Sequence, residues 1–242
     1  MVADPSVELS LEPGPLIPDP TRHRSLVVYN LLTKPKGRWV YDSVGSSIAV
    51  WKDGTARPVR PVVRPGVSNP TLLFQGPEPQ SLAGAVVVGD TLYLYATKQS
   101  IMSRSVSVAK APLADCLDHD AWRYYAGAGR WSESPTDAVE IMRSSWQLTV
   151  HWNPYLRKYL AVTSRIGTNE IDLWTADRPE GPWSLRQEIR TPVEPIVPGQ
   201  TTWEALGHVE LARDGGRVEY LTYARPIDAF NREVRLMEIV FR

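Results

Sequence analysis

Apolar side chains recur along this chain in short runs, and many of the runs alternate apolar and polar positions. The runs are rich in Val, Ile, Leu, Tyr and Trp and are bounded by Gly, Pro, Asp and Asn, a pattern typical of β-strands. The clearest examples are Ser25–Tyr29, Ser47–Trp51, Ala85–Val88, Thr91–Tyr95, Lys158–Val162, Ile171–Trp174, Arg217–Tyr223 and Val234–Val240. The chain is therefore predicted to be all-β.

Turn residues separate these runs at the spacing of hairpins. Gly89 and Asp90 join two of them, and Asp214–Gly216 precedes another. Helical periodicity is scarce, because 21 prolines interrupt the chain. The best helix candidate is the short segment Leu113–Tyr125, with Asp115 as its N-cap.

Two kinds of strand recur in a fixed order. The first kind is found at Ser25–Asn30, Thr91–Thr97, Arg157–Ser164 and Val218–Arg225. The second kind follows each copy, at Ser47–Trp51, Val106–Lys110, Ile171–Thr175 and Val234–Glu238. Both series advance with a period of roughly 60 residues, as the blades of a β-propeller do. The predicted fold class is thus all-β, a β-propeller of antiparallel blades with about four visible units and little helix.

The third unit shows how a complete blade is built from four strands. They are predicted at Gln147–His151, Lys158–Ser164, Ile171–Ala176 and Leu185–Ile189. The final unit ends after its third strand, and Val7–Leu11 is a candidate to supply its outer strand. A β-sandwich, which also has short strands at even spacing, is the alternative fold. The common register of the two strand series favours the propeller.

Charge and composition narrow the class of protein. The chain has 27 Lys and Arg residues against 27 Asp and Glu, together with nine Trp and ten Tyr. A protein that binds duplex nucleic acid normally shows a basic excess, and a disordered chain has few aromatic residues. We expect a folded monomer that binds neither nucleic acid nor membrane.

The remaining composition signals are negative ones. Cys116 is the single cysteine, so it cannot form an internal disulfide, and we expect it to be a small buried hydrophobic residue. The N-terminal residues lack the basic and apolar regions of a signal peptide, and no apolar run approaches the ~18 residues of a membrane span. At face value the chain is cytoplasmic, or secreted if its true start lies upstream.

Carboxylates near the starts of the inner strands would face the axial pocket of a propeller. Glu204, Asp42 and Glu78 occupy such positions in the predicted units. Hydrolysis of a glycosidic bond needs two carboxyl groups, one on each side of the bond. We take Glu204 and Asp42 as the candidate catalytic pair and Glu78 as a candidate binding residue. For each of the three, a solvated loop position is the alternative interpretation.

Other residue types fit the binding of a sugar. His208 is predicted at the start of an inner strand, where it would bind a sugar hydroxyl, adjust a carboxylate or serve a structural role. Trp203 and Trp51 could stack on sugar rings, although core packing is the alternative for any tryptophan. Ser46 and Gln147 complete the candidate binding residues.

The run Asp118–Asp120, with a histidine at its centre, has the composition of a metal site. Consecutive residues on a helical turn point in different directions, however, so we expect a solvated helix face there. No metal ligand and no cofactor are assigned from the residues.

Two stretches of the third unit carry a family resemblance. His151–Tyr159 reads His-Trp-Asn-Pro-Tyr-Leu-Arg-Lys-Tyr, and Ile171–Ser184 contains Asp-Arg-Pro-Glu-Gly-Pro-Trp-Ser. Both resemble blades of five-bladed β-propeller glycoside hydrolases, and they are most similar to domain-of-unknown-function family 4185, a group similar to bacterial endo-D-arabinanases. Shorter stretches at Val44–Trp51, Ala109–Leu113, Ala121–Gly127, Gly207–Leu211 and Glu233–Phe241 extend the resemblance.

The resemblance implies a single propeller domain over residues 1–242 and an arabinan-type polysaccharide as substrate. It implies five blades, so that the four visible units would lack the N-terminal blade, and it allows for calcium in the channel. Three hypotheses follow: a glycoside hydrolase with an axial carboxylate pair, a non-catalytic carbohydrate-binding or incomplete propeller, and a propeller that binds other proteins.

Overall fold

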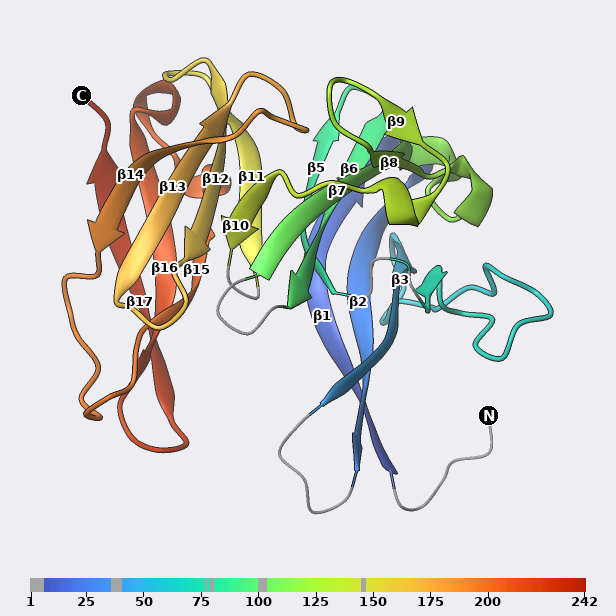
Figure 1. Ribbon diagram of the computed structural model, residues 1–242, viewed down its shortest axis with the longest axis horizontal. Helices are drawn as coiled ribbons and strands as arrows, with labels where there is room; N and C mark the ends of the chain where they lie inside the picture. Colours follow the sequence, from blue (N-terminus) through green and yellow to red (C-terminus); the bar gives the residue numbers. More distant parts are fainter. Residues whose placement is uncertain (1–6, 36–40, 77, 79–80, 100–103, 145–146) are drawn as a thin grey trace. The chain divides into compact units, whose positions relative to one another are not determined.

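Strands form almost all of the regular structure in the computed structural model of the chain (Figure 1). The model describes residues 7–35, 41–76, 78, 81–99, 104–144 and 147–242. Across these residues the helical segments are 3-10 turns of three residues each: η1 (Pro20–Arg22), η2 (Leu113–Asp115), η3 (His119–Ala121), η4 (Pro135–Asp137), η5 (Val209–Leu211) and η6 (Asp214–Gly216). No helix in the described part of the chain is long and apolar enough to cross a membrane. The prediction of an all-β chain with little helix is confirmed.

The first two sheets follow each other along the chain. The first has the order β1-β2-β3-β4, formed by β1 (Val7–Asp19), β2 (Arg24–Pro35), β3 (Asp42–Lys52) and β4 (Phe74–Gln75). The second runs β5-β6-β7-β8-β9, formed by β5 (Leu82–Val88), β6 (Thr91–Gln99), β7 (Arg104–Pro112), β8 (Arg123–Tyr125) and β9 (Trp131–Ser132). β10 (Met142–Ser144) also pairs with β7.

The next two sheets have the same up-and-down order. The third is β11-β12-β13-β14, formed by β11 (Leu148–Asn153), β12 (Lys158–Ser164), β13 (Glu170–Ala176) and β14 (Ser184–Arg190). The fourth is β15-β16-β17, formed by β15 (Trp203–Gly207), β16 (Val218–Pro226) and β17 (Arg232–Val240). Four sheets of sequential antiparallel strands are the blades of a β-propeller fold, as predicted.

The two repeated strand series take equivalent places in the four sheets. The first series becomes the second strand of each sheet, namely β2, β6, β12 and β16. The second series becomes the third strand, namely β3, β7, β13 and β17. The four strands predicted for the third unit also match β11–β14 closely. The period in the sequence is therefore a real structural repeat.

Two local predictions are wrong. The helix expected over Leu113–Tyr125 is replaced by η2, η3 and the strand β8, and it is Asp118, not Asp115, whose side chain accepts a cap hydrogen bond, from the N–H of Asp120. Val7–Leu11 does not form an outer strand of the last sheet. It lies in β1 and pairs with β2 in the first sheet, because its alternating pattern is satisfied by the nearest long strand.

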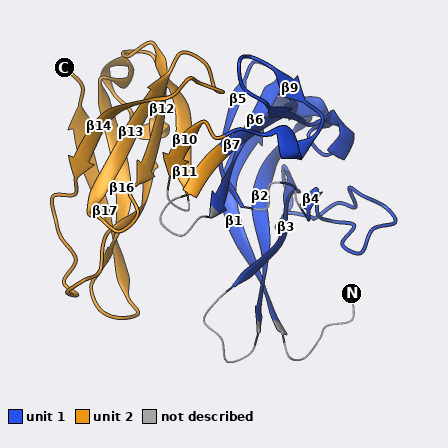
Figure 2. Cartoon of the chain, in the orientation of Figure 1, with its two compact units in different colours: residues 1–98, 107–139 blue, residues 99–106, 140–242 orange. Residues whose placement is uncertain are grey.

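The chain forms two compact units (Figure 2), each with its own core. Unit 1 contains residues 1–98 and 107–139, and unit 2 contains residues 99–106 and 140–242. Leu26, Ile48, Leu94 and Trp122 lie in the core of unit 1. The core of unit 2 includes Leu160, Val162, Leu173, Leu221 and Tyr223.

Within each unit, polar side chains join the first strand of one sheet to the sheet before it. In unit 1 the buried Asn30 side chain accepts a hydrogen bond from the Leu82 N–H (2.9 Å) and donates to the Leu82 carbonyl (3.3 Å). In unit 2 the Gly207 N–H donates to Thr149 Oγ1 (2.8 Å), and the Ala205 N–H donates to Ser164 Oγ (2.9 Å). These bonds satisfy backbone groups at strand edges that have no backbone partner there.

The core of unit 2 generates a stability prediction. Leu160 is 0% exposed in β12, whereas Leu236 is 58% exposed in β17. Leu160→Ala should lower the free energy of unfolding by about 2–5 kcal/mol, because it removes buried methyl groups and leaves a cavity. Leu236→Ala is the matched control and should change it by less than about 0.5 kcal/mol. Urea denaturation followed by circular dichroism measures both, and equal losses would contradict this assignment of the core.

Candidate functional site

Glu204 is the second residue of β15 and lies at a β-bulge. Trp203 pairs with Ala224 and Leu206 with Thr222, so two residues of β15 stand opposite one residue of β16. Glu204 has a φ of 56°, in the left-handed region that costs a residue with a side chain about 1–2 kcal/mol. The bulge re-aims the exposed Glu204 side chain, and such bulges are frequent beside functional sites. Backbone strain of this kind also concentrates at functional sites.

The surroundings of Glu204 leave its carboxylate free. Among the described residues it has no hydrogen bond and no ion pair. Its neighbour Trp203 is 37% exposed, and the Arg232 guanidinium lies 5.3 Å from the centre of the Trp203 ring. A hydrogen bond from the Thr202 N–H to Asn169 Oδ1 (2.9 Å) holds the start of β15. An exposed tryptophan and a carboxylate without a partner in the described part of the chain are thus consecutive residues of β15.

Gln147 lies at the end of the third sheet that contacts the segment carrying Glu204. It comes directly before β11, and its carbonyl accepts a hydrogen bond from Thr163 Oγ1 (3.0 Å). The next residue of β12, Ser164, accepts from the Ala205 N–H. The end of β12 therefore holds both Gln147 and the segment that carries Glu204, so the structure brings these two predicted residues into one neighbourhood.

His208 does not lie where the sequence analysis placed it. It follows the end of β15 and caps η5, whereas Glu204 lies near the start of the strand. Its Nδ1 contacts Glu210 Oε1 (2.8 Å) and its Nε2 contacts Thr222 Oγ1 (2.8 Å), so both ring nitrogens have partners. Sequence reasoning put the strand start too late, since the apolar run Val209–Leu211 resembles a strand but forms a 3-10 turn.

The candidates of unit 1 are spread along β3. Asp42 is its first residue and is exposed, Ser46 is fully buried, and Trp51 lies close to its end. The Trp51 indole N–H donates to the Thr55 carbonyl (2.9 Å). A strand rises about 3.3 Å per residue, so β3 does not bring these three together. Asp42 belongs to unit 1 and Glu204 to unit 2, and their pairing stays a prediction.

Glu78 is engaged by neighbours in unit 1. Its Oε2 accepts hydrogen bonds from Arg64 Nη1 (2.9 Å) and from the Gln75 N–H (2.6 Å), and its Oε1 contacts His119 Nε2. The carboxylate lines an open cavity of about 310 Å³. These contacts tie the Glu78 side chain to Arg64, Gln75 and η3, and its role in binding stays a prediction. His119 is accordingly not on a solvated helix face.

One carboxylate was missed by the sequence analysis. Glu12 lies on β1, and its Oε2 accepts a hydrogen bond from Asn30 Nδ2 (3.4 Å), while Asn30 also holds Leu82 at the start of β5. A bulge follows Glu12 in β1. The alternation Glu8-Leu9-Ser10-Leu11-Glu12 was the available signal.

No group of three or more His, Cys, Asp or Glu side chains in the described residues is arranged to hold a metal ion. The Asp118–Asp120 run makes local contacts instead: Asp118 caps η3, and His119 Nδ1 contacts Asp120 Oδ1 (3.1 Å). Cys116 is fully buried, as predicted, and burial raises the pKa of its thiol to about 11.

Comparison with solved structures defines the class of fold. A protein of Bacteroides ovatus described as a hydrolase matches with a TM-score of 0.63 and 15% identity, over 92% of this chain and 56% of that one. A family 117 glycoside hydrolase of the marine bacterium Zobellia galactanivorans matches with a TM-score of 0.53 and 10% identity, over 92% of this chain and 58% of that one. The chain thus has the fold of glycoside hydrolase propellers, and it spans a little over half the length of these two proteins.

Residues 45–221 match the family model described as domain of unknown function DUF4185. Because the match covers more than half of the chain, the chain belongs to this family, as the resemblance implied. A comparison with curated proteins finds no match.

The backbone of Glu204 generates a test of the strained bulge. Glu204→Gly should leave the free energy of unfolding unchanged or raise it by up to about 1 kcal/mol, because glycine adopts a positive φ without strain. Gln187→Gly, at an exposed position of β14, is the control and should lose about 0.5–1 kcal/mol. Urea denaturation measures both; a clear loss for Glu204→Gly would argue against the left-handed conformation.

The buried thiol generates a second test. Since burial raises the pKa of Cys116 to about 11 and the side chain is inaccessible, a disulfide reagent at pH 8 should label the native chain at least about a hundredfold more slowly than the urea-unfolded chain. The release of the thiolate chromophore over time measures the rate. Rapid labelling of the native chain would show that this part of the core opens readily.

Proposed function

We propose that the chain is a glycoside hydrolase-like propeller that binds and cleaves a polysaccharide of the arabinan type, with Glu204 as one of its catalytic carboxyl groups. The observation that carries the proposal is the Glu204 carboxylate, which has no partner among the described residues and stands in a strained bulge directly after the exposed Trp203. The fold of glycoside hydrolase propellers and membership of the DUF4185 family support the same class of activity.

Cleavage needs a second carboxyl group, and Asp42, which is exposed at the start of β3, is the candidate that the sequence predicts. A separation of about 5–5.5 Å from Glu204 would give retention of configuration, and about 6.5–9.5 Å would give inversion. In either case Glu204 protonates the departing oxygen, while its partner attacks the sugar or activates a water molecule.

Binding of the glycan would use the neighbours of Glu204. Trp203 offers its exposed ring to the apolar side of a sugar. Gln147, directly before β11, stays a predicted binding residue. The other residues predicted to bind the sugar stay predictions, namely His208, Trp51, Ser46 and Glu78. The single domain over residues 1–242, the five blades and the calcium ion of the resembling group also stay predictions.

A non-catalytic carbohydrate-binding propeller is the second candidate function. The carboxylate of Glu78 is engaged by Arg64, His119 and a backbone N–H, which makes it unsuited to proton transfer. If Asp42 is not the partner of Glu204, the chain retains an exposed tryptophan, Trp203, next in sequence to a single candidate acid.

Arabinan hydrolysis by the purified chain tests the proposal. Release of reducing ends from arabinan should fall at least about a hundredfold in Glu204→Gln, because the general acid typically contributes 10²–10⁴-fold. Asp42→Asn tests the predicted partner, since it should cause a comparable loss. Glu133→Gln, at an exposed carboxylate of unit 1, is the control.

Binding assays separate the two functions. Arabinan retained by the native chain and by Glu204→Gln without any hydrolysis would support the non-catalytic function instead. An active chain in which Glu204→Gln keeps full activity would overturn the assignment of the acid.

A further inference from the structure

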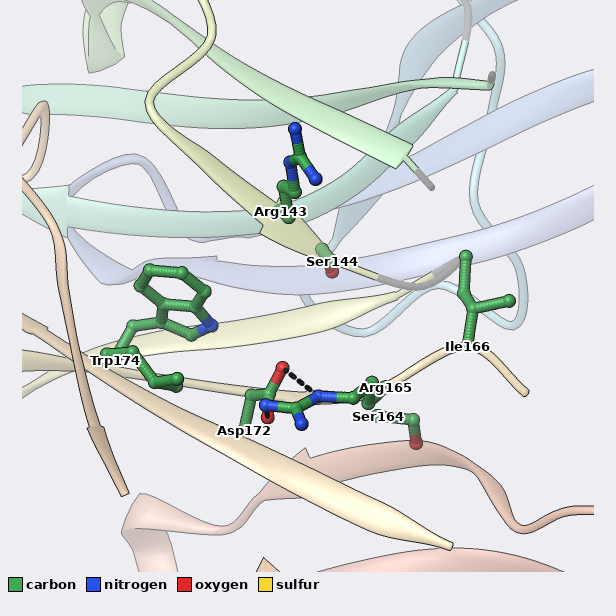
Figure 3. Close-up of a pocket in the computed structure, with 8 residues that line it drawn as sticks. Arg143, Ser144, Ser164, Arg165, Ile166, Asp172 and Trp174 are labelled. Atoms are coloured by element: carbon green, nitrogen blue, oxygen red, sulfur yellow. Dashed lines mark hydrogen bonds and ion pairs between the residues drawn. The ribbon is translucent and has the colours of Figure 1, made fainter. Parts of the chain in front are cut away.

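A second feature of unit 2 is an open cavity of about 390 Å³ on one face of the third sheet (Figure 3). Side chains from β10, β12, β13 and β14 and from the turn after β12 line it: Arg143, Ser144, Ser164, Arg165, Ile166, Asp172, Trp174 and Leu185. None of these residues was predicted from the sequence to bind a ligand. The cavity adjoins the segment of Glu204, because Ser164 accepts the hydrogen bond of the Ala205 N–H.

Trp174 contributes an unused hydrogen-bond donor. Its Nε1 is buried and has no partner among the described residues, and Figure 3 shows the indole nitrogen directed into the cavity. Leaving a buried donor unsatisfied costs about 1–3 kcal/mol. A bulge in the pairing of β13 with β14, between Leu173 and Trp174, sets the position of the ring.

Asp172 supplies acceptors next to this donor. It is buried two residues before Trp174, on the same face of β13. Arg165 holds it through Nη2 to Oδ1 (2.7 Å) and Nε to Oδ2 (3.3 Å). An ionised carboxylate has about four lone-pair sites, so acceptor capacity remains for a ligand. Burial raises the pKa of this carboxyl, with Arg165 opposing the shift.

The charges of the cavity favour a neutral ligand. Arg165 also contacts Glu170 and Glu188, so three carboxylates surround its guanidinium. Arg143 faces Glu140 at 3.4 Å. The carboxylates outnumber the guanidinium that they contact, so the cavity has little attraction for an anion. The Trp174 N–H needs an acceptor atom, which a simple cation lacks. Leu185, a cross-strand neighbour of Trp174, lines the cavity and adds a small apolar surface beside the ring.

We propose that this cavity binds one sugar residue of a neutral glycan, with the Trp174 N–H donating to a ring or hydroxyl oxygen and Asp172 accepting from a hydroxyl group. A sugar has hydroxyl groups, which donate and accept hydrogen bonds, and an apolar C–H face. The cavity offers a partner for each of these. A volume of about 390 Å³ is at the lower end of the range for small-molecule sites. The proposal rests on the proposed function only in taking a glycan as the ligand.

Isothermal titration calorimetry with arabinotriose and with β-1,3-galactotriose tests the cavity, in a Glu204→Gln background that prevents cleavage. Trp174→Phe keeps the aromatic ring and removes only the N–H. It should weaken binding of at least one probe about three- to tenfold, the effect of one lost hydrogen bond. Its Tm should stay unchanged or rise, because the removed donor was unsatisfied. Asp172→Asn should also weaken binding.

Two control variants make the result specific. Trp152→Phe, at an exposed tryptophan of β11, should leave binding unchanged, and Trp203→Ala tests the neighbourhood of Glu204 separately. If neither probe binds, or if only Trp203→Ala weakens binding, the cavity proposal is overturned. The proposed function is judged separately by arabinan hydrolysis, so the two can fail independently.

Discussion

The joints between successive sheets depend on one constraint: a strand at the edge of a sheet has backbone groups that must find partners. Where the first strand of one sheet meets the sheet before it, the two backbones do not pair. Side chains take over this role, through Asn30 for Leu82 in unit 1 and through Thr149 and Ser164 for β15 in unit 2. These two joints are thus encoded by individual polar residues, and the joint in unit 2 holds the segment that carries Glu204.

The repeat could be predicted from the sequence because it depends on the simplest physical signal. A sheet covered on both faces needs apolar residues at regular places in its second and third strands, and the two series report those strands directly. The prediction of a helix over Leu113–Tyr125 was wrong, because short 3-10 turns in this segment bury the apolar side chains of Leu113 and Trp122 without an α-helix. Apolar spacing alone does not distinguish an α-helix from such turns.

The candidate site was less accessible to sequence reasoning, because it depends on where strands begin. The sequence analysis placed the first strand of the fourth sheet a few residues too late. His208 was therefore expected at the start of this strand but follows its end, whereas Glu204 does lie near the start. The cavity of Trp174 was missed for another reason. A tryptophan in a strand pattern usually packs in a core, and only the absence of a partner for its N–H distinguishes this one.

The burial of Cys116 has a practical consequence. The single thiol of the chain is enclosed by the core of unit 1 and bears a proton at ordinary pH, so the fold is insensitive to the redox potential of its surroundings. A cysteine introduced on the surface would be the single reactive thiol of the native protein. Spectroscopic labels could therefore be attached at chosen positions on either unit, without first replacing a native residue.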